Sequence, residues 1–114
     1  MIEKIAGDDC FALVHDTIHH FMAAESDFFP ELTGIVEISG VEIPGTVKPC
    51  DIPDSERVLV GPKDEIENLE QLKTLLDKGY SGAVSYEVFS PIVQSMENIE
   101  GALKESIEFV SSSL

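Results

Sequence analysis

The sequence alternates between short apolar runs and stretches whose apolar residues recur at helical spacing. The apolar runs at 10–14, 35–39 and 83–89 have the length and residue types of strands. Helical spacing follows at 66–76 and 97–114, where leucine, isoleucine and valine recur every three or four residues. Strands that alternate with helices are typical of α/β folds, in which crossovers join parallel strands. We therefore predict an α/β fold with three parallel strands and their helices.

The segments between these elements carry weaker signals. A helical turn is predicted over 1–6, and a short helix over 21–25 follows the first strand. Residues 41–64 are broken by prolines and glycines, and a loop of this length is usually functional or flexible. Asp64 and Glu67 resemble a capping box, which predicts that the next helix begins there.

Composition excludes several classes of function. The 114 residues suit one domain, and a hydrophobic fraction of 43% is enough for a core. The 22 acidic and 7 basic residues give a net charge of −15, so we expect neither nucleic acid nor a membrane as partner. Cys10 and Cys50 lack the spacing of a redox or zinc motif. No segment has the apolar length of a signal peptide or membrane span, so we expect a cytoplasmic protein.

An acidic residue stands near the C-terminal end of each predicted strand: Asp16, Glu37 and Glu87. These ends meet at one edge of a parallel sheet, where ligands collect in α/β folds. Carboxylate oxygens are the ligands that hard cations such as Mg²⁺ and Mn²⁺ require. The sequence therefore predicts a metal site at this edge. The alternative for the first acid is that Asp16 or Thr17 caps the following helix.

Two further residues are functional candidates. His19 follows Asp16 by three residues, on the same side of the predicted strand end. Arg57 is the only arginine, and its guanidinium suits a carboxylate or a phosphate. An ordinary surface ion pair explains Arg57 equally well in a chain this acidic.

Four segments, taken in order, carry a family resemblance: DTIHH at 16–20, TGIVEISGV at 33–41, RVLVG at 57–61 and GYSGAVSYE at 79–87. Together they resemble the xylose isomerase-like TIM barrels called sugar phosphate isomerases/epimerases. The resemblance covers nearly the whole chain. It implies that residues 1–114 are a single partial domain, the last three strands and their helices of a barrel of about 250 residues.

The resemblance also implies a divalent metal, held in the family by acids on strands five, six and eight and by a histidine on strand seven. Asp16 corresponds to the strand-six acid and Glu87 to the strand-eight acid. His19 and Arg57 correspond to residues that bind substrate. Glu37 stands where the family has its histidine, and the strand-five acid has no counterpart. The implied metal is Mn²⁺ or Mg²⁺, with Co²⁺ or Zn²⁺ as alternatives.

The implied function is that of a fragment of a metal-dependent isomerase or epimerase acting on a sugar or sugar phosphate. Such enzymes transfer a proton next to a metal-bound carbonyl. Glu87 would be the catalytic residue. The family's epimerases use two glutamates, so we expect the isolated chain to be inactive. An inosose dehydratase-like lyase fragment and a non-catalytic metal-binding or oligomerising remnant are the alternatives.

An incomplete barrel also predicts a protein partner, because its two outer strands each lack a neighbour. We expect apolar side chains that face the barrel interior to be uncovered as well, among them Leu13, Ile35, Ile38, Val84 and Tyr86. The chain should therefore form a homo-oligomer or bind a complementing chain that supplies the N-terminal part of the barrel.

Overall fold

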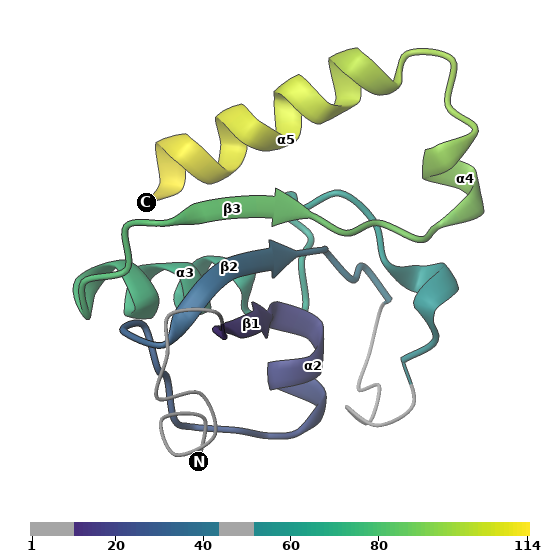
Figure 1. Ribbon diagram of the computed structural model, residues 1–114. Coiled ribbons are helices and arrows are strands. Elements are labelled where there is room, and N and C mark those ends of the chain that lie inside the picture. Colours follow the sequence, from purple (N-terminus) through teal and green to yellow (C-terminus); the bar gives the residue numbers. More distant parts are fainter. Residues whose placement is uncertain (1–10, 44–51) are drawn as a thin grey trace.

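The computed structural model describes residues 11–43 and 52–114. The elements in chain order are β1 (Leu13–Asp16), α2 (Thr17–Met22), β2 (Thr33–Ile38), the 3₁₀ helix η2 (Asp54–Glu56), α3 (Asn68–Asp77), β3 (Ala83–Tyr86), α4 (Pro91–Gln94) and α5 (Ile99–Ser113) (Figure 1). No helix within the two described ranges is long and apolar enough to cross a membrane. The turn predicted over 1–6 and both cysteines lie outside the described residues.

The three strands form one parallel sheet in the order β1-β2-β3, which confirms the predicted α/β fold. The last pair between β1 and β2 is Asp16 opposite Glu37, and the last pair between β2 and β3 is Ile38 opposite Tyr86. All three C-terminal ends therefore point to the same edge of the sheet, towards α4 in Figure 1. This is the edge at which the predicted acids stand.

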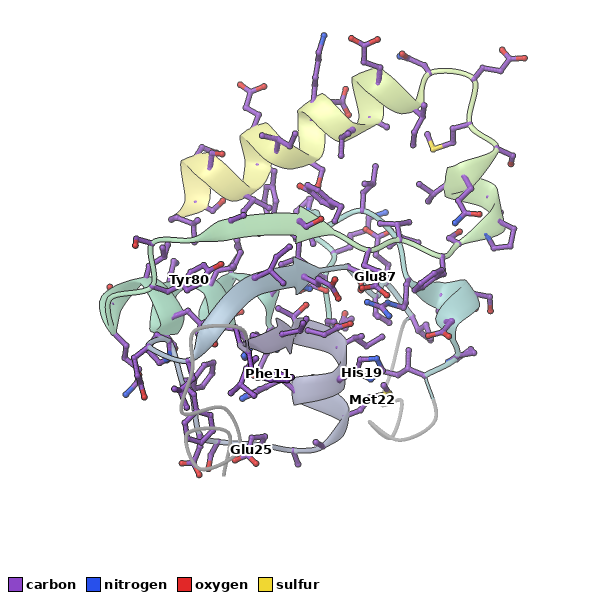
Figure 2. The ribbon with its side chains drawn as sticks, viewed as in Figure 1. Phe11, His19, Met22, Glu25, Tyr80 and Glu87 are labelled. Carbon is purple, nitrogen blue, oxygen red and sulfur yellow. The ribbon has the colours of Figure 1, made fainter. Side chains whose placement is uncertain are left out.

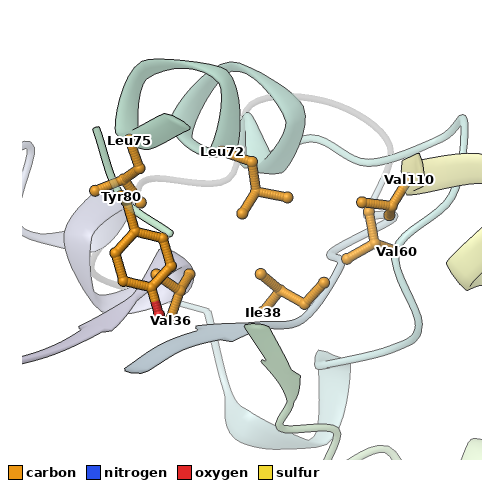
Figure 3. Close-up of a cluster of buried hydrophobic side chains, with 7 residues drawn as sticks. All are labelled: Val36, Ile38, Val60, Leu72, Leu75, Tyr80 and Val110. Carbon is orange, nitrogen blue, oxygen red and sulfur yellow. The ribbon is translucent and has the colours of Figure 1, made fainter. Parts of the chain in front are cut away.

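The core lies on the side of the sheet that faces α3 and α5. Seven side chains from β2, the helices and the connecting loops form its main cluster: Val36, Ile38, Val60, Leu72, Leu75, Tyr80 and Val110 (Figure 3). Because neighbouring side chains on a strand point to opposite faces, Glu37 lies on the other side of the sheet from Val36 and Ile38. The acids are thus separated from the apolar core by the sheet.

The same alternation corrects one expectation about the uncovered face. Ile38 is buried against the helices, and the Tyr86 hydroxyl lies 2.8 Å from the Ser106 hydroxyl of α5. Val84 shares their side of the sheet, where it lines a groove with Ile107. The prediction that Ile38, Val84 and Tyr86 face the barrel interior is therefore wrong. Strand register places Ile35, opposite Val14 and Ala83, on the side of the acids.

Helix α3 begins later than the capping-box pattern predicts. Its first residue is Asn68, and Glu67 at the cap has a left-handed backbone with φ of 61° and makes no capping hydrogen bond through its side chain. The Asp64 carboxylate instead accepts from the backbone N–H groups of Asn68 at 2.9 Å and Val41 at 3.1 Å. Asp64 therefore joins the helix start to the chain that leaves β2.

Candidate metal centre

Three carboxylates from three successive strands meet at the C-terminal edge of the sheet. Asp16 ends β1, Glu37 is the fifth residue of β2, and Glu87 directly follows β3. One oxygen of each lies within 4.8 Å of the others. Each arrives there because the parallel register brings Asp16 opposite Glu37, while the backbone N–H of Glu87 donates to the carbonyl of Ile38 at 2.9 Å. Such a group of oxygens can hold a hard divalent cation.

Crowding of negative charge perturbs Glu37 most. Its pKa is raised to about 7, first by a hydrogen bond with Glu87 and then by desolvation and the charges of Glu87 and Asp16. Arg57 acts in the opposite direction. Glu37 therefore keeps its proton to a higher pH than an ordinary glutamate does. A divalent cation would relieve the same repulsion.

Arg57 is the buried counter-ion of this cluster. Its side chain is only 1% exposed, and Nη2 lies 3.0 and 3.3 Å from the two oxygens of Asp16. Nε donates to the Ser39 hydroxyl at 2.9 Å, and Nη1 lies 3.8 Å from Glu87. The guanidinium carbon also stands 5.1 Å from the centre of the Phe89 ring. The alternative of a surface ion pair is therefore wrong, whereas a role in substrate binding stays a prediction.

The backbone around Arg57 explains how one arginine reaches this edge. The 3₁₀ helix η2 delivers it, and the carbonyl of Arg57 accepts from the N–H groups of Phe89 and Ser90. Val58 then forms an antiparallel bridge with Gly40. The segment is thus fixed between the chains that leave β2 and β3.

The three histidines, His15, His19 and His20, have different surroundings. His19 is 63% exposed, with Nε2 at 3.7 Å from Asp16, and Figure 2 shows it with Glu87 at the same end of the sheet. His15 points to the other side of the sheet, where Nε2 lies 2.8 Å from the Gln71 side-chain oxygen and burial lowers its pKa. His20 packs against His15 and Phe28. Of the three, His19 is the one whose ring nitrogen lies beside the carboxylate cluster.

Asp16 also caps the helix that follows it. Its Oδ1 accepts from the backbone N–H of Ile18 at 3.1 Å, so the alternative of a helix cap holds for this residue. The two roles are compatible because a carboxylate has about four lone-pair positions.

An open hollow of about 480 Å³ lies over the acids, a size that suits a small molecule. Its wall comes mainly from β1, α2 and the loop before β2: Leu13, Val14, His15, Asp16, His19, His20, Ala23, Glu25, Asp27, Phe29, Thr33, Glu37 and Glu87. The structure thus brings Asp16, His19, Glu37 and Glu87 around one space, and it places Arg57 beneath them.

Sequence reasoning missed the buried polar residues that support this edge, namely Ser39, Asn68 and Gln71. All three are buried and hydrogen-bonded. Asn68 and Gln71 lie on the face of α3 that carries Leu72 and Leu75. Polar residues on the apolar face of a predicted helix are the signal that could have identified them.

A parallel sheet with helices on one face and acids at its C-terminal edge is the arrangement found in a TIM barrel. The chain is indeed similar to part of such a barrel in two solved structures. A xylose isomerase domain containing protein from Salmonella typhimurium LT2 matches 96% of this chain with a TM-score of 0.83 and 26% identity. The IolI protein with a binding zinc atom matches 99% with a TM-score of 0.76 and 23% identity.

These matches confirm the resemblance to xylose isomerase-like TIM barrels at the level of fold. The chain spans 42% of the length of each matched protein. No protein-family model and no curated protein matches the sequence.

Proposed function

We propose that the chain is part of a divalent-metal-dependent isomerase or epimerase that acts on a sugar or sugar phosphate. The observation that carries this proposal is the convergence of Asp16, Glu37 and Glu87 within 4.8 Å at the C-terminal edge of the sheet. The similarity to a xylose isomerase domain containing protein supports the substrate class. A TIM barrel places its active site at this same edge.

The ligand set favours Mn²⁺ or Mg²⁺, since all three groups are carboxylates. Co²⁺ and Zn²⁺ are secondary candidates, and the matched IolI structure contains zinc. Asp16 can accept from Arg57 and still offer an oxygen, because Nη2 contacts both oxygens and Ile18 only Oδ1, which leaves lone-pair capacity on Oδ2. The residues present therefore fit a hard cation.

When bound, the metal would polarise a carbonyl of the substrate. Glu87, on the barrel-facing side of the site, takes the proton from the neighbouring carbon or returns it. Glu37 is hydrogen-bonded to Glu87 in the metal-free site and would give up its proton on becoming a ligand of the metal. His19 binds the substrate from the exposed rim, while Arg57 offsets the charge of Asp16 and Glu87 from below.

A second proton-transfer group is needed for epimerisation, and we propose that it lies on strands beyond this sheet. In the described residues β1 and β3 each pair with β2 alone. Phe11 is 61% and Val14 58% exposed beside the free edge of β1. In the functional protein, further barrel strands of the same or another polypeptide, or a second copy of this chain, cover these edges.

Calorimetric titration with Mn²⁺ tests the metal site. Asp16→Asn/Glu87→Gln should abolish binding, because it removes two of the three charged ligands. The exposed pair Glu70→Gln/Glu105→Gln is the control for loss of two negative charges elsewhere, and it should bind as the unmodified chain does. Equal affinity in all three proteins would remove the metal site.

A further inference from the structure

A closed ring of hydrogen bonds runs from Asp16 through the core and back to the same residue. Thr17, which directly follows Asp16, donates its hydroxyl to Oδ1 of Asn68 at 2.6 Å. Nδ2 of Asn68 donates to the carbonyl of Ser39 at 2.8 Å. The Ser39 hydroxyl accepts from Nε of Arg57, whose Nη2 donates to the Asp16 carboxylate. Thr17, Ser39 and Asn68 are 0% exposed, so water does not compete for these bonds.

Asn68 occupies the place where the sheet itself stops. The ladder between β1 and β2 ends at the pair of Asp16 and Glu37. Beyond this pair the chain turns into α2 on one side and continues to Ser39 on the other. The Asn68 amide contacts both continuations, with one group for each. It therefore links the Thr17 side chain to the Ser39 backbone beyond the last pair of the ladder.

We propose that Asn68 is a positioning residue for the metal site. It holds the ends of β1 and β2, and hence the Asp16 and Glu37 carboxylates, at the separation that one cation requires. This inference rests on the proposed metal-dependent function. Groups that orient metal ligands typically change metal affinity by about 10- to 100-fold when they are removed.

The test uses Asn68→Leu, which keeps the shape of the side chain and removes both hydrogen-bonding groups. The variant also removes the bond from Nδ2 to the Asp64 carboxylate at 3.0 Å, but the backbone N–H of residue 68 still donates to that carboxylate at 2.9 Å. Gln71→Met is the matched control. Gln71 is a buried amide on the same helix, but its hydrogen bonds go to His15, Thr17 and Ile66 and to no residue of β2 or Ser39.

Two measurements on the folded proteins separate positioning from general stability. Mn²⁺ affinity should fall by about 10-fold or more in Asn68→Leu and by much less in Gln71→Met. Without metal, hydrogen exchange of the Arg57 Nε–H, measured by ¹⁵N NMR, should become about tenfold faster in Asn68→Leu and should not change in Gln71→Met. A tenfold change corresponds to the loss of about one hydrogen bond. Arg57 is the only arginine, so its signal needs no separate assignment.

Unchanged affinity and exchange in Asn68→Leu, or equal changes in both variants, would overturn the positioning role. If the unmodified chain binds no Mn²⁺, the proposed function fails, whereas faster Arg57 exchange in Asn68→Leu still supports the ring. Should Asn68→Leu not fold, Thr17→Val removes only the hydroxyl bond to Asn68 at constant volume. It should shift both measurements in the same direction, and no shift would refute the proposal.

Discussion

Replacing Arg57 by methionine should destabilise the metal-free protein by about 3–5 kcal/mol, the cost of removing one partner of a buried ion pair. The magnitude follows from its contacts. Two bonds to the Asp16 carboxylate are lost, together with one to the Ser39 hydroxyl. Hydrogen bonds to charged groups contribute about 1.5–3 kcal/mol each, and the desolvation that the guanidinium no longer requires offsets part of the sum. Urea unfolding followed by circular dichroism, in EDTA and at one protein concentration, measures the loss.

Two further variants identify the cause of this loss. Arg57→Lys keeps the charge but cannot contact Asp16 and Ser39 together, so its loss should be intermediate. Arg57→Met/Asp16→Asn should be about 1–3 kcal/mol more stable than Arg57→Met, since no charge is left unpaired. Mn²⁺ at a fixed concentration should stabilise Arg57→Met more than the unmodified chain, because the site has lost its internal cation. A loss below about 1 kcal/mol, or a double variant no more stable than Arg57→Met, would refute the assignment of Arg57 as counter-ion.

Three other outcomes are expected. Mn²⁺ affinity should rise with pH up to about 7 and then level off, because the raised pKa of Glu37 makes a proton compete with the metal below that pH. Calorimetry in buffers of different ionisation enthalpy measures the released proton. An affinity independent of pH between about 5 and 8 would contradict this competition. Light scattering during size-exclusion chromatography should show the isolated chain as an oligomer, and a single 12.5 kDa species that unfolds cooperatively would be evidence against uncovered strand edges. The isolated chain should show no epimerase activity on keto-sugars, and turnover that disappears in Glu87→Gln would prove this expectation wrong.

The strand ends were predictable because they depend on local patterns. Apolar runs alternating with helical stripes imply parallel strands, and parallel strands bring their last residues to one edge. Asp16, Glu37 and Glu87 could therefore be grouped from their positions alone. The family resemblance added that these strands belong to a barrel, and the chain matches part of two solved structures of this kind.

The support of the site could not be predicted in the same way. Arg57 becomes buried because residues 57–58 are fixed between the chains leaving β2 and β3, and this depends on contacts far apart in sequence. The start of α3 was predicted too early because Asp64 and Glu67 were expected to cap a helix that begins directly after Asp64. The Asp64 carboxylate accepts from the N–H groups of Ile66, Asn68 and Val41, but the left-handed backbone of Glu67 delays the helix until Asn68.

One row of side chains on the acid side of the sheet is uneven in size. Register aligns Val14 of β1, Ile35 of β2 and Ala83 of β3 in this row, so the largest side chain lies in the middle and the smallest at the β3 edge. Protein interiors are close-packed, so whatever covers this row must carry a small residue over Ile35 and a bulky one over Ala83. A void left over Ala83 would cost about 24 cal/mol per Å³. The unequal ends of this row therefore favour one orientation of the covering layer over its reverse.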